Sequence, residues 1–415
     1  MTETYTYTGG VLRPGYLAGG RAGAPATGPG KWRDSRIDLI RGLALATIFI
    51  NHVPGNPFEH YTSRNFGFSD AAEAFVLLAG VSAALAYARP MQGPNLWSGT
   101  AKIWSRAWTL YLVHILISLA VIAVVTGLLR FYGVPDMMAK DGFRLLVEDP
   151  VGVLIGLPLM LHQFGYVNIL PLYVLLLLAT PGLLLLAQRS PALLLTGSVL
   201  LWGFAGLSFT NLPNWPSKGG WFLNPMSWQL IYVIGLMIGL RLKDKERLVP
   251  AHPVLIALAL IVVIGALVWL RVPGMAGLGN AVMVKLSQLG LPPLLTNFNK
   301  GYVQAPRLMH LLALAYLVSL ISFLPRLSAS RWVWPLVVMG RQALPVFALG
   351  TVLSFVARAV KAVAAPEQVF ASPLEIFLLD VTLIGGGLLA LIGFAAVFDA
   401  AKTAARSEKA APRQA

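Results

Sequence analysis

The sequence lacks cysteine and is poor in charge, since none of its 415 residues is Cys and only 12% are Asp, Glu, Lys or Arg. Without cysteine there is no disulfide, no thiolate metal site and no cysteine nucleophile. A soluble domain carries about a quarter charged residues, whereas here 57% of residues are hydrophobic and the mean hydropathy is +0.70. Several apolar runs approach the ~20 residues that cross a bilayer. The composition therefore predicts a protein embedded in the lipid bilayer.

Several catalytic motifs are also absent. The chain has no G-x-S-x-G elbow of a serine hydrolase, no G-x-x-x-x-G-K-[ST] phosphate loop and no H-E-x-x-H zinc pair. None of its six histidines is followed by Asp four or five positions later, which excludes the short His–Asp motif of soluble glycerolipid acyltransferases. We therefore expect neither a metal nor a tightly bound cofactor.

The apolar stretches predict an all-α membrane bundle of about ten crossings. They cover residues 37–53, 71–88, 103–128, 151–187, 191–209, 227–241, 253–271, 308–325, 334–357 and 376–398. The fourth stretch is too long for one simple helix and contains Pro158 and Pro171. It predicts a broken or re-entrant segment, which membrane proteins tolerate where the backbone lines an enclosed or wet cavity.

The basic residues set the expected orientation. The net charge is +15, but Lys and Arg are scattered at the ends of apolar segments, as in oriented membrane helices, so nucleic acid is excluded as a partner. Their excess is larger on the side that holds both termini, which predicts cytoplasmic termini. We expect a disordered cytoplasmic tail at 1–33, a membrane domain at 34–399 and a cytoplasmic tail at 400–415. The loops expected on the outside lie near 53–70, 130–150, 210–226, 271–307 and 358–375.

The first crossing, "RIDLIRGLALATIFINHVPGNP", carries Arg41 and His52 eleven residues apart. Helical geometry places them about 20° apart around the axis and about 16 Å apart along it. Asp38, one turn before Arg41, is expected to pair with it. His52 is suited to proton transfer near neutral pH. The alternative, in which Arg41 extends to the headgroups and His52 caps the helix, is equally compatible with the spacing.

The second crossing begins with Asp70 and Glu73 in "HYTSRNFGFSDAAEAFVLLAG". The two acids share a helical face, and they also match a capping box with Asp70 as N-cap and Glu73 at the third position. The two interpretations are compatible, because a carboxylate beside His52 could orient the imidazole. Small residues such as Ala79 and Gly80 predict that this helix packs closely on the first.

Two further groups have open roles. Lys102 and Arg106, one turn apart on the third crossing, are either interfacial anchors or a cytoplasmic site for phosphates. The segment "WFLNPMSWQL" brings together an aromatic and amide group of side chains that fits either sugar binding or an interfacial aromatic belt. This group consists of Trp221, Asn224, Trp228 and Gln229.

Several strings together resemble the OpgC family of inner-membrane proteins, which succinylate osmoregulated periplasmic glucans. They are "RDSRIDLIRGLALATIFINHVPGNP", "RNFGFSDAAEAFVLLAG", "AWTLYLVH", "NILPLY" and "WFLNPMSWQLIYVIG", in this order over roughly residues 33 to 240. Arg41 and His52 also resemble the Arg/Lys-x10-His pattern of the wider transmembrane acyltransferase superfamily. The Arg-x-x-Arg motif of that superfamily has only an imperfect counterpart in Lys102 and Arg106.

The resemblance implies ten transmembrane helices in a bacterial inner membrane, a cytoplasmic acyl-CoA donor and a periplasmic glucan acceptor. It implies His52 as catalytic base, with Asp70 or Glu73 orienting it, and a CoA path past Arg36, Arg41, Lys102 and Arg106. The expected activity is transfer of succinyl from succinyl-CoA to a glucosyl hydroxyl. Two alternatives remain open at this point, a transporter of a glycan or anion without chemistry and the same fold using acetyl-CoA.

Overall fold

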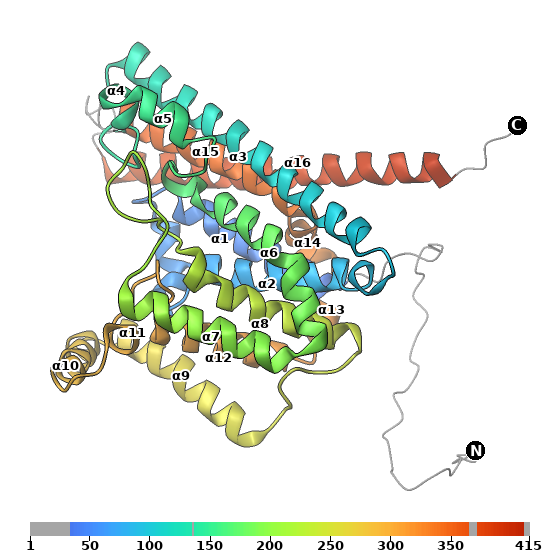
Figure 1. Ribbon diagram of the computed structural model, residues 1–415. Coiled ribbons are helices and arrows are strands. Elements are labelled where there is room, and N and C mark those ends of the chain that lie inside the picture. The colour runs from blue at the N-terminus through green and yellow to red at the C-terminus, as the bar shows by residue number, and fades with distance from the viewer. Residues whose placement is uncertain (1–33, 135–136, 365–371, 411–415) are drawn as a thin grey trace, which may run out of the picture. The chain divides into compact units, whose positions relative to one another are not determined.

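The computed structural model describes residues 34–134, 137–364 and 372–410, and the regular elements in these residues are helices (Figure 1). The prediction of an all-α protein is confirmed. The longer helices are α1 (Ser35–Asn51), α2 (Ala71–Tyr87), α3 (Leu96–Tyr132), α5 (Pro150–Gly156), α6 (Ile169–Arg189), α7 (Pro191–Ser208), α8 (Pro225–Lys243), α9 (Pro253–Arg271), α10 (Met275–Gln288), α12 (Ala305–Ser319), α14 (Trp334–Arg341), α15 (Ala343–Ala364) and α16 (Pro373–Ala410). The shorter ones include α4 (Leu145–Glu148), α11 (Pro293–Thr296) and α13 (Leu324–Ser328).

The structure also bears on the predicted tails. The tail expected at 1–33 lies outside the described residues. The tail expected at 400–415 begins inside α16, which continues as a helix to Ala410.

Seven helices of the described chain are long and apolar enough to cross a membrane, namely α3, α6, α7, α8, α9, α15 and α16. They coincide with seven of the ten predicted crossings, and they make the chain a membrane protein. The other three crossings correspond to α1, α2 and α12, which have 17, 17 and 15 residues. At 1.5 Å per residue these helices are about 22–26 Å long, slightly less than a hydrocarbon core of about 30 Å. The expected count of ten is therefore approximate.

The predicted break within 151–187 is confirmed. Helix α5 ends at Gly156, and the chain passes through a short 3₁₀ helix, η4 (Gly165–Asn168), before α6 begins. The connecting backbone includes Met160 and Gly165 at positive φ, 58° and 39°. These conformations cannot continue an α-helix, so the polar residues of this segment are presented on a loop.

Helix α2 contacts α1, as the sequence predicted, but its most extensive contact is with α8. The glycines explain the difference. A Cβ at Gly80 would collide with the carbonyl oxygen of Tyr232 in α8, and a Cβ at Gly235 would collide with that of Leu77 in α2. The two backbones therefore approach each other closely at these glycines, which have no side chain to separate them. The glycine partners in α8 lie about 150 residues further along the chain than α2.

The loops expected on the outside gather at one end of the helices. Lys300 bonds to Asp70, and Arg358 bonds to Asp141. At the other end, Ser35 bonds to Ser328, which joins the start of α1 to the connection between α12 and α14. In Figure 1 the first group lies at the left, near α4, α10 and α11, and α13 and α14 lie toward the right. The alternation of the loops deduced from charge is thus consistent with the fold.

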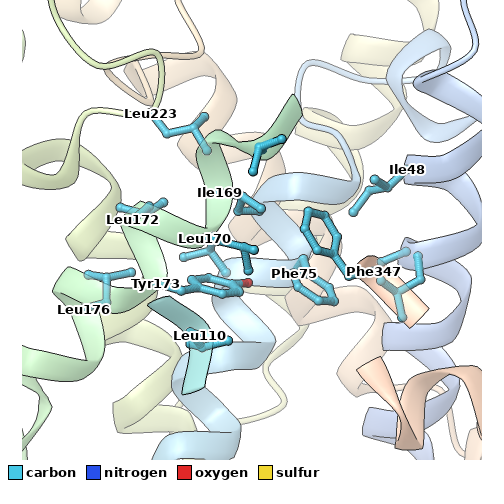
Figure 2. Close-up of a cluster of buried hydrophobic side chains, with 14 of the residues drawn as sticks. Ile48, Phe75, Leu110, Ile169, Leu170, Leu172, Tyr173, Leu176, Leu223 and Phe347 are labelled. Atoms are coloured by element: carbon cyan, nitrogen blue, oxygen red, sulfur yellow. The ribbon is translucent and has the colours of Figure 1, made fainter. Parts of the chain in front are cut away.

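Aromatic side chains fill the centre where α1, α2, α6 and α15 meet (Figure 2). Phe75 of α2 lies between Tyr173 of α6 and Phe347 of α15, with ring centroids 5.8 and 6.5 Å away. Ile48 of α1 lies beside Phe347 in the same cluster (Figure 2). This packing fixes the outer half of α1, and with it the position of the residue that follows the helix.

Replacing Gly80 by Ala is expected to destabilise the fold by about 1–3 kcal/mol, because the added methyl group overpacks the contact between α2 and α8. Gly203→Ala in α7 is the matched control, since a Cβ there meets no atom within 4 Å and alanine favours the helix by up to about 1 kcal/mol. Thermal unfolding in detergent measures both variants. Equal melting temperatures would contradict the proposed role of this glycine contact.

Candidate functional site

His52 is held at the end of α1. Its backbone N–H donates to the carbonyl of Ile48 at 3.0 Å, and its ring stacks on Tyr166 with centroids 3.7 Å apart and planes at 12°. The side chain of Asn56 donates to the carbonyls of Ile50 and Val53 just beside it. Asn56 thus performs the capping that the sequence left open for His52, and the imidazole is turned toward Tyr166 instead.

The imidazole lines a cavity of about 150 Å³, which we call the central cavity. Its polar lining consists of Asn51, His52, Arg64, Asp70, Tyr166, Asn168 and Lys300. Ile48 and Phe347, from the buried aromatic cluster, line its apolar side. A histidine, a carboxylate, two cations and two amides therefore surround one small space at the end of a membrane bundle.

The start of α2 is a capping box, as the sequence predicted. The Asp70 carboxylate accepts the N–H of Ala72 at 2.8 Å, and the Glu73 carboxylate accepts the N–H of Asp70 at 3.1 Å. Their remaining oxygens accept from cations. Lys300 Nζ lies 2.6 Å from Asp70 Oδ2, and Arg307 Nε lies 2.7 Å from Glu73 Oε1. The hydrogen bonds of both carboxylates thus go to the helix start and to two cations.

Neighbouring groups determine the protonation state of the Asp70 carboxyl. Burial alone would raise the pKa of this carboxyl, but the charge and hydrogen bond of Lys300, a hydrogen bond with Glu73 and the charge of Arg307 together outweigh burial and hold the pKa below its usual range. Asp70 is therefore a carboxylate on the central cavity, ion-paired with Lys300. Orientation of His52 by Asp70 or Glu73 stays a prediction.

Sequence reasoning missed Lys300 and Arg307. Both belong to "NFNKGYVQAPR", which the sequence placed in an outside loop without a function. One signal was available. Two acids at the start of an apolar helix need partners, and this loop offers two cations near a helix start. The residue that fixes Lys300 is Trp228 of α8, whose indole N–H donates to the Lys300 carbonyl at 3.1 Å.

The four residues predicted to bind sugar lie in the interior of the fold or at helix starts. Asn224 caps α8 and donates to the carbonyl of Thr210, and Gln229 donates to the carbonyl of Ser198. Trp221 and Trp228 are buried. None of the four lines the central cavity, whereas Phe222, next to Trp221, does. Their role toward a sugar stays untested.

The residues predicted to bind CoA lie away from the central cavity. Arg41 pairs with Asp38 at 3.7 Å, as expected, and also donates to Ser82 of α2. It therefore lies inside the bundle. Lys102 and Arg106 are exposed on α3, which is compatible with both of their predicted roles. Arg36 precedes them at the same end of the bundle, on the first turn of α1.

Apolar helices that enclose a charged and histidine-containing cavity at one end define a class, a polytopic membrane protein with a polar site. Residues 33–403 match the family model described as OpgC protein, so the chain belongs to this family. The match confirms the resemblance seen in the sequence and extends it to the later helices. No curated protein and no solved structure matches the chain. Family membership supports an acyltransferase-type membrane enzyme.

Replacing Arg307 by Ala is expected to lower the free energy of unfolding by about 3–5 kcal/mol, because it leaves Glu73 buried without its cation. Arg241→Ala is the control, since the Arg241–Glu246 pair is exposed on both sides and contributes less than about 1 kcal/mol. Denaturation in mixed micelles measures both. Similar losses for the two variants would show that the buried pair does not stabilise the fold.

Proposed function

We propose that this protein is an inner-membrane O-acyltransferase that moves a succinyl group from succinyl-CoA to a glucosyl hydroxyl of a periplasmic glucan. The observation that carries the proposal is His52, held on Tyr166 and facing a polar cavity with Asp70 and Lys300. Membership in the OpgC family supports the class of enzyme. The donor, the acceptor and the base are our inference.

In the proposed reaction His52 acts as general base. Its unprotonated nitrogen takes the proton of the sugar hydroxyl while the hydroxyl oxygen attacks the thioester carbonyl carbon. The carbon–oxygen bond of the ester forms and the carbon–sulfur bond breaks. The imidazolium returns its proton to the CoA sulfur, which leaves as the thiol. No oxidant, metal or covalent enzyme intermediate is needed.

The neighbours of His52 suit this chemistry. Tyr166 fixes the ring plane by stacking. Asp70, paired with Lys300, places a carboxylate on the same cavity and offsets part of the positive charge around the imidazole. Lys300 and Arg64 add positive charge there, which favours both the oxyanion of the tetrahedral state and the free carboxylate of a succinyl group.

The proposed donor path runs along α1. Arg36 and Arg41 lie toward its start and His52 directly follows its end, so one helix connects the two ends of the bundle. With both termini in the cytoplasm, the phosphates of CoA would meet Arg36, Arg41, Lys102 and Arg106, and the thioester would extend toward His52. The acceptor would enter from the periplasm.

The His52→Ala variant is expected to lose about 100- to 10,000-fold in acyl transfer, the usual contribution of a general base. The assay is transfer of labelled succinyl to glucan by purified enzyme in detergent. His60→Ala is the control, because His60 is exposed on the neighbouring 3₁₀ helix Pro57–Tyr61. Near wild-type turnover by folded His52→Ala would exclude His52 as the base.

Incubation of the wild-type protein with succinyl-CoA and glucan is expected to release CoA and to add an anionic group to the glycan. A transporter without chemistry would release no CoA. Mass spectrometry of the glycan identifies the acyl group, since a succinyl ester adds a carboxylate and an acetyl ester does not. A neutral acetylated product would overturn succinyl-CoA as the donor but would not contradict the fold or the role of His52 as the base.

A further inference from the structure

Two larger cavities adjoin the central cavity, one on each side. The first, of about 280 Å³, shares Arg64 and Asp70 with it, and we call it the Trp269 cavity. The second, of about 260 Å³, shares Tyr166, Asn168 and Phe222 with it, and we call it the Asn214 cavity. Because each outer cavity shares lining residues with the central one, the three adjoin in a row, with the central cavity and His52 in the middle.

The Trp269 cavity combines aromatic rings with polar groups. Trp269 and Phe298 line it with their ring centroids 5.6 Å apart, and the indole packs on Gly279 of α10. At its edge lie the exposed side chain of Asn280, which carries an amide donor, and Arg307, whose Nε and Nη2 already donate to Glu73. Aromatic rings next to polar side chains suit a ligand with apolar faces and hydroxyl groups at its edges.

The Asn214 cavity is rich in amides. The Oδ1 atom of Asn214 is buried and has no hydrogen-bond partner among the described residues. Asn168 does not cap α6, although it stands at the start of that helix. Phe222 is 56% exposed and lines both this cavity and the central one. A buried acceptor without a partner costs free energy unless a ligand or water supplies a donor.

We infer that the row of three cavities is one acceptor groove that holds three consecutive sugar units, with the reacting unit at His52 and its neighbours in the two outer cavities. The inference rests on the proposed acyl transfer and adds the binding mode of the acceptor. Each outer cavity alone is at the lower limit of ligand pockets, about 300–1,000 Å³, whereas the row as a whole falls within that range.

The position of the groove agrees with an acceptor from outside. Part of its lining comes from loops that the charge pattern placed on the outside, namely Arg64 from 53–70, Asn280 from 271–307 and Asn214 from 210–226. A chain that passes through three cavities would continue beyond both ends. The groove therefore favours an internal unit of a glucan over a free monosaccharide.

The test compares glucose with linear gluco-oligosaccharides of two to five units as acceptors of succinyl-CoA. We expect kcat/KM to rise up to the third unit and then to level off. Asn214→Ala and Asn280→Ala each remove one hydrogen-bonding side chain from an outer cavity. Each should lower kcat/KM for the three-unit acceptor roughly 3- to 10-fold and that for glucose by less than about twofold. Gln288→Ala, on the same helix as Asn280 but outside the groove, is the control.

Calorimetric titration of the three-unit sugar without any donor measures the groove independently of catalysis. The wild type should bind this sugar more tightly than glucose, and the two variants should weaken its binding by the same factors as above. If the enzyme transfers no acyl group but the sugar affinities follow this pattern, the proposed acyl transfer is contradicted and the proposed groove is supported. If glucose binds and reacts as well as the three-unit sugar, or if both variants match Gln288→Ala, the groove is overturned.

Discussion

The pairing of Glu73 and Asp70 with Arg307 and Lys300 is the interaction on which the site depends. Glu73 is fully buried at the start of an apolar helix, where an unpaired carboxylate would be costly. The two cations remove that cost only if the first turn of α12, with Arg307, and the loop before it, with Lys300, lie against the start of α2. This requirement brings Lys300 to the central cavity, and Trp228 of α8 then fixes its backbone. One charge network thus joins α2, α8 and α12 around His52.

The glycine contact between α2 and α8 supports the same arrangement from the interior. Gly80, Gly235 and Gly239 let the two backbones approach closely, and close approach favours packing between helices in a bilayer. The contact fixes the position of α2 relative to α8. Since Asp70 begins α2 and Trp228 lies in the first turns of α8, the ion pairs lie at one end of this close contact.

Features local in the sequence could be predicted. Hydropathy located the helices, the spacing of Asp70 and Glu73 predicted the capping box, and that of Asp38 and Arg41 predicted their pairing. Charge alternation grouped the loops by side. Partners distant in the chain could not be predicted, because hydropathy contains no information on which helices meet. Lys300 lies 230 residues after Asp70, and Tyr166 comes from the broken segment, whose backbone follows no regular period.

The segment that follows Gly220 shows why the aromatic group at this end was hard to interpret. Trp221 and Leu223 are buried, whereas Phe222 between them is exposed. The chain bends at Phe222 and Leu223, so burial alternates from one residue to the next and a shift by one residue would exchange the buried and exposed rings. The position of this segment along its neighbours is fixed by contacts that the sequence does not reveal. The backbone N–H of Trp221 donates to the Leu212 carbonyl, and the side chain of Asn211 donates to the carbonyl of Trp221. These bonds turn the tryptophan inward for packing and leave the smaller ring of Phe222 to face the cavities.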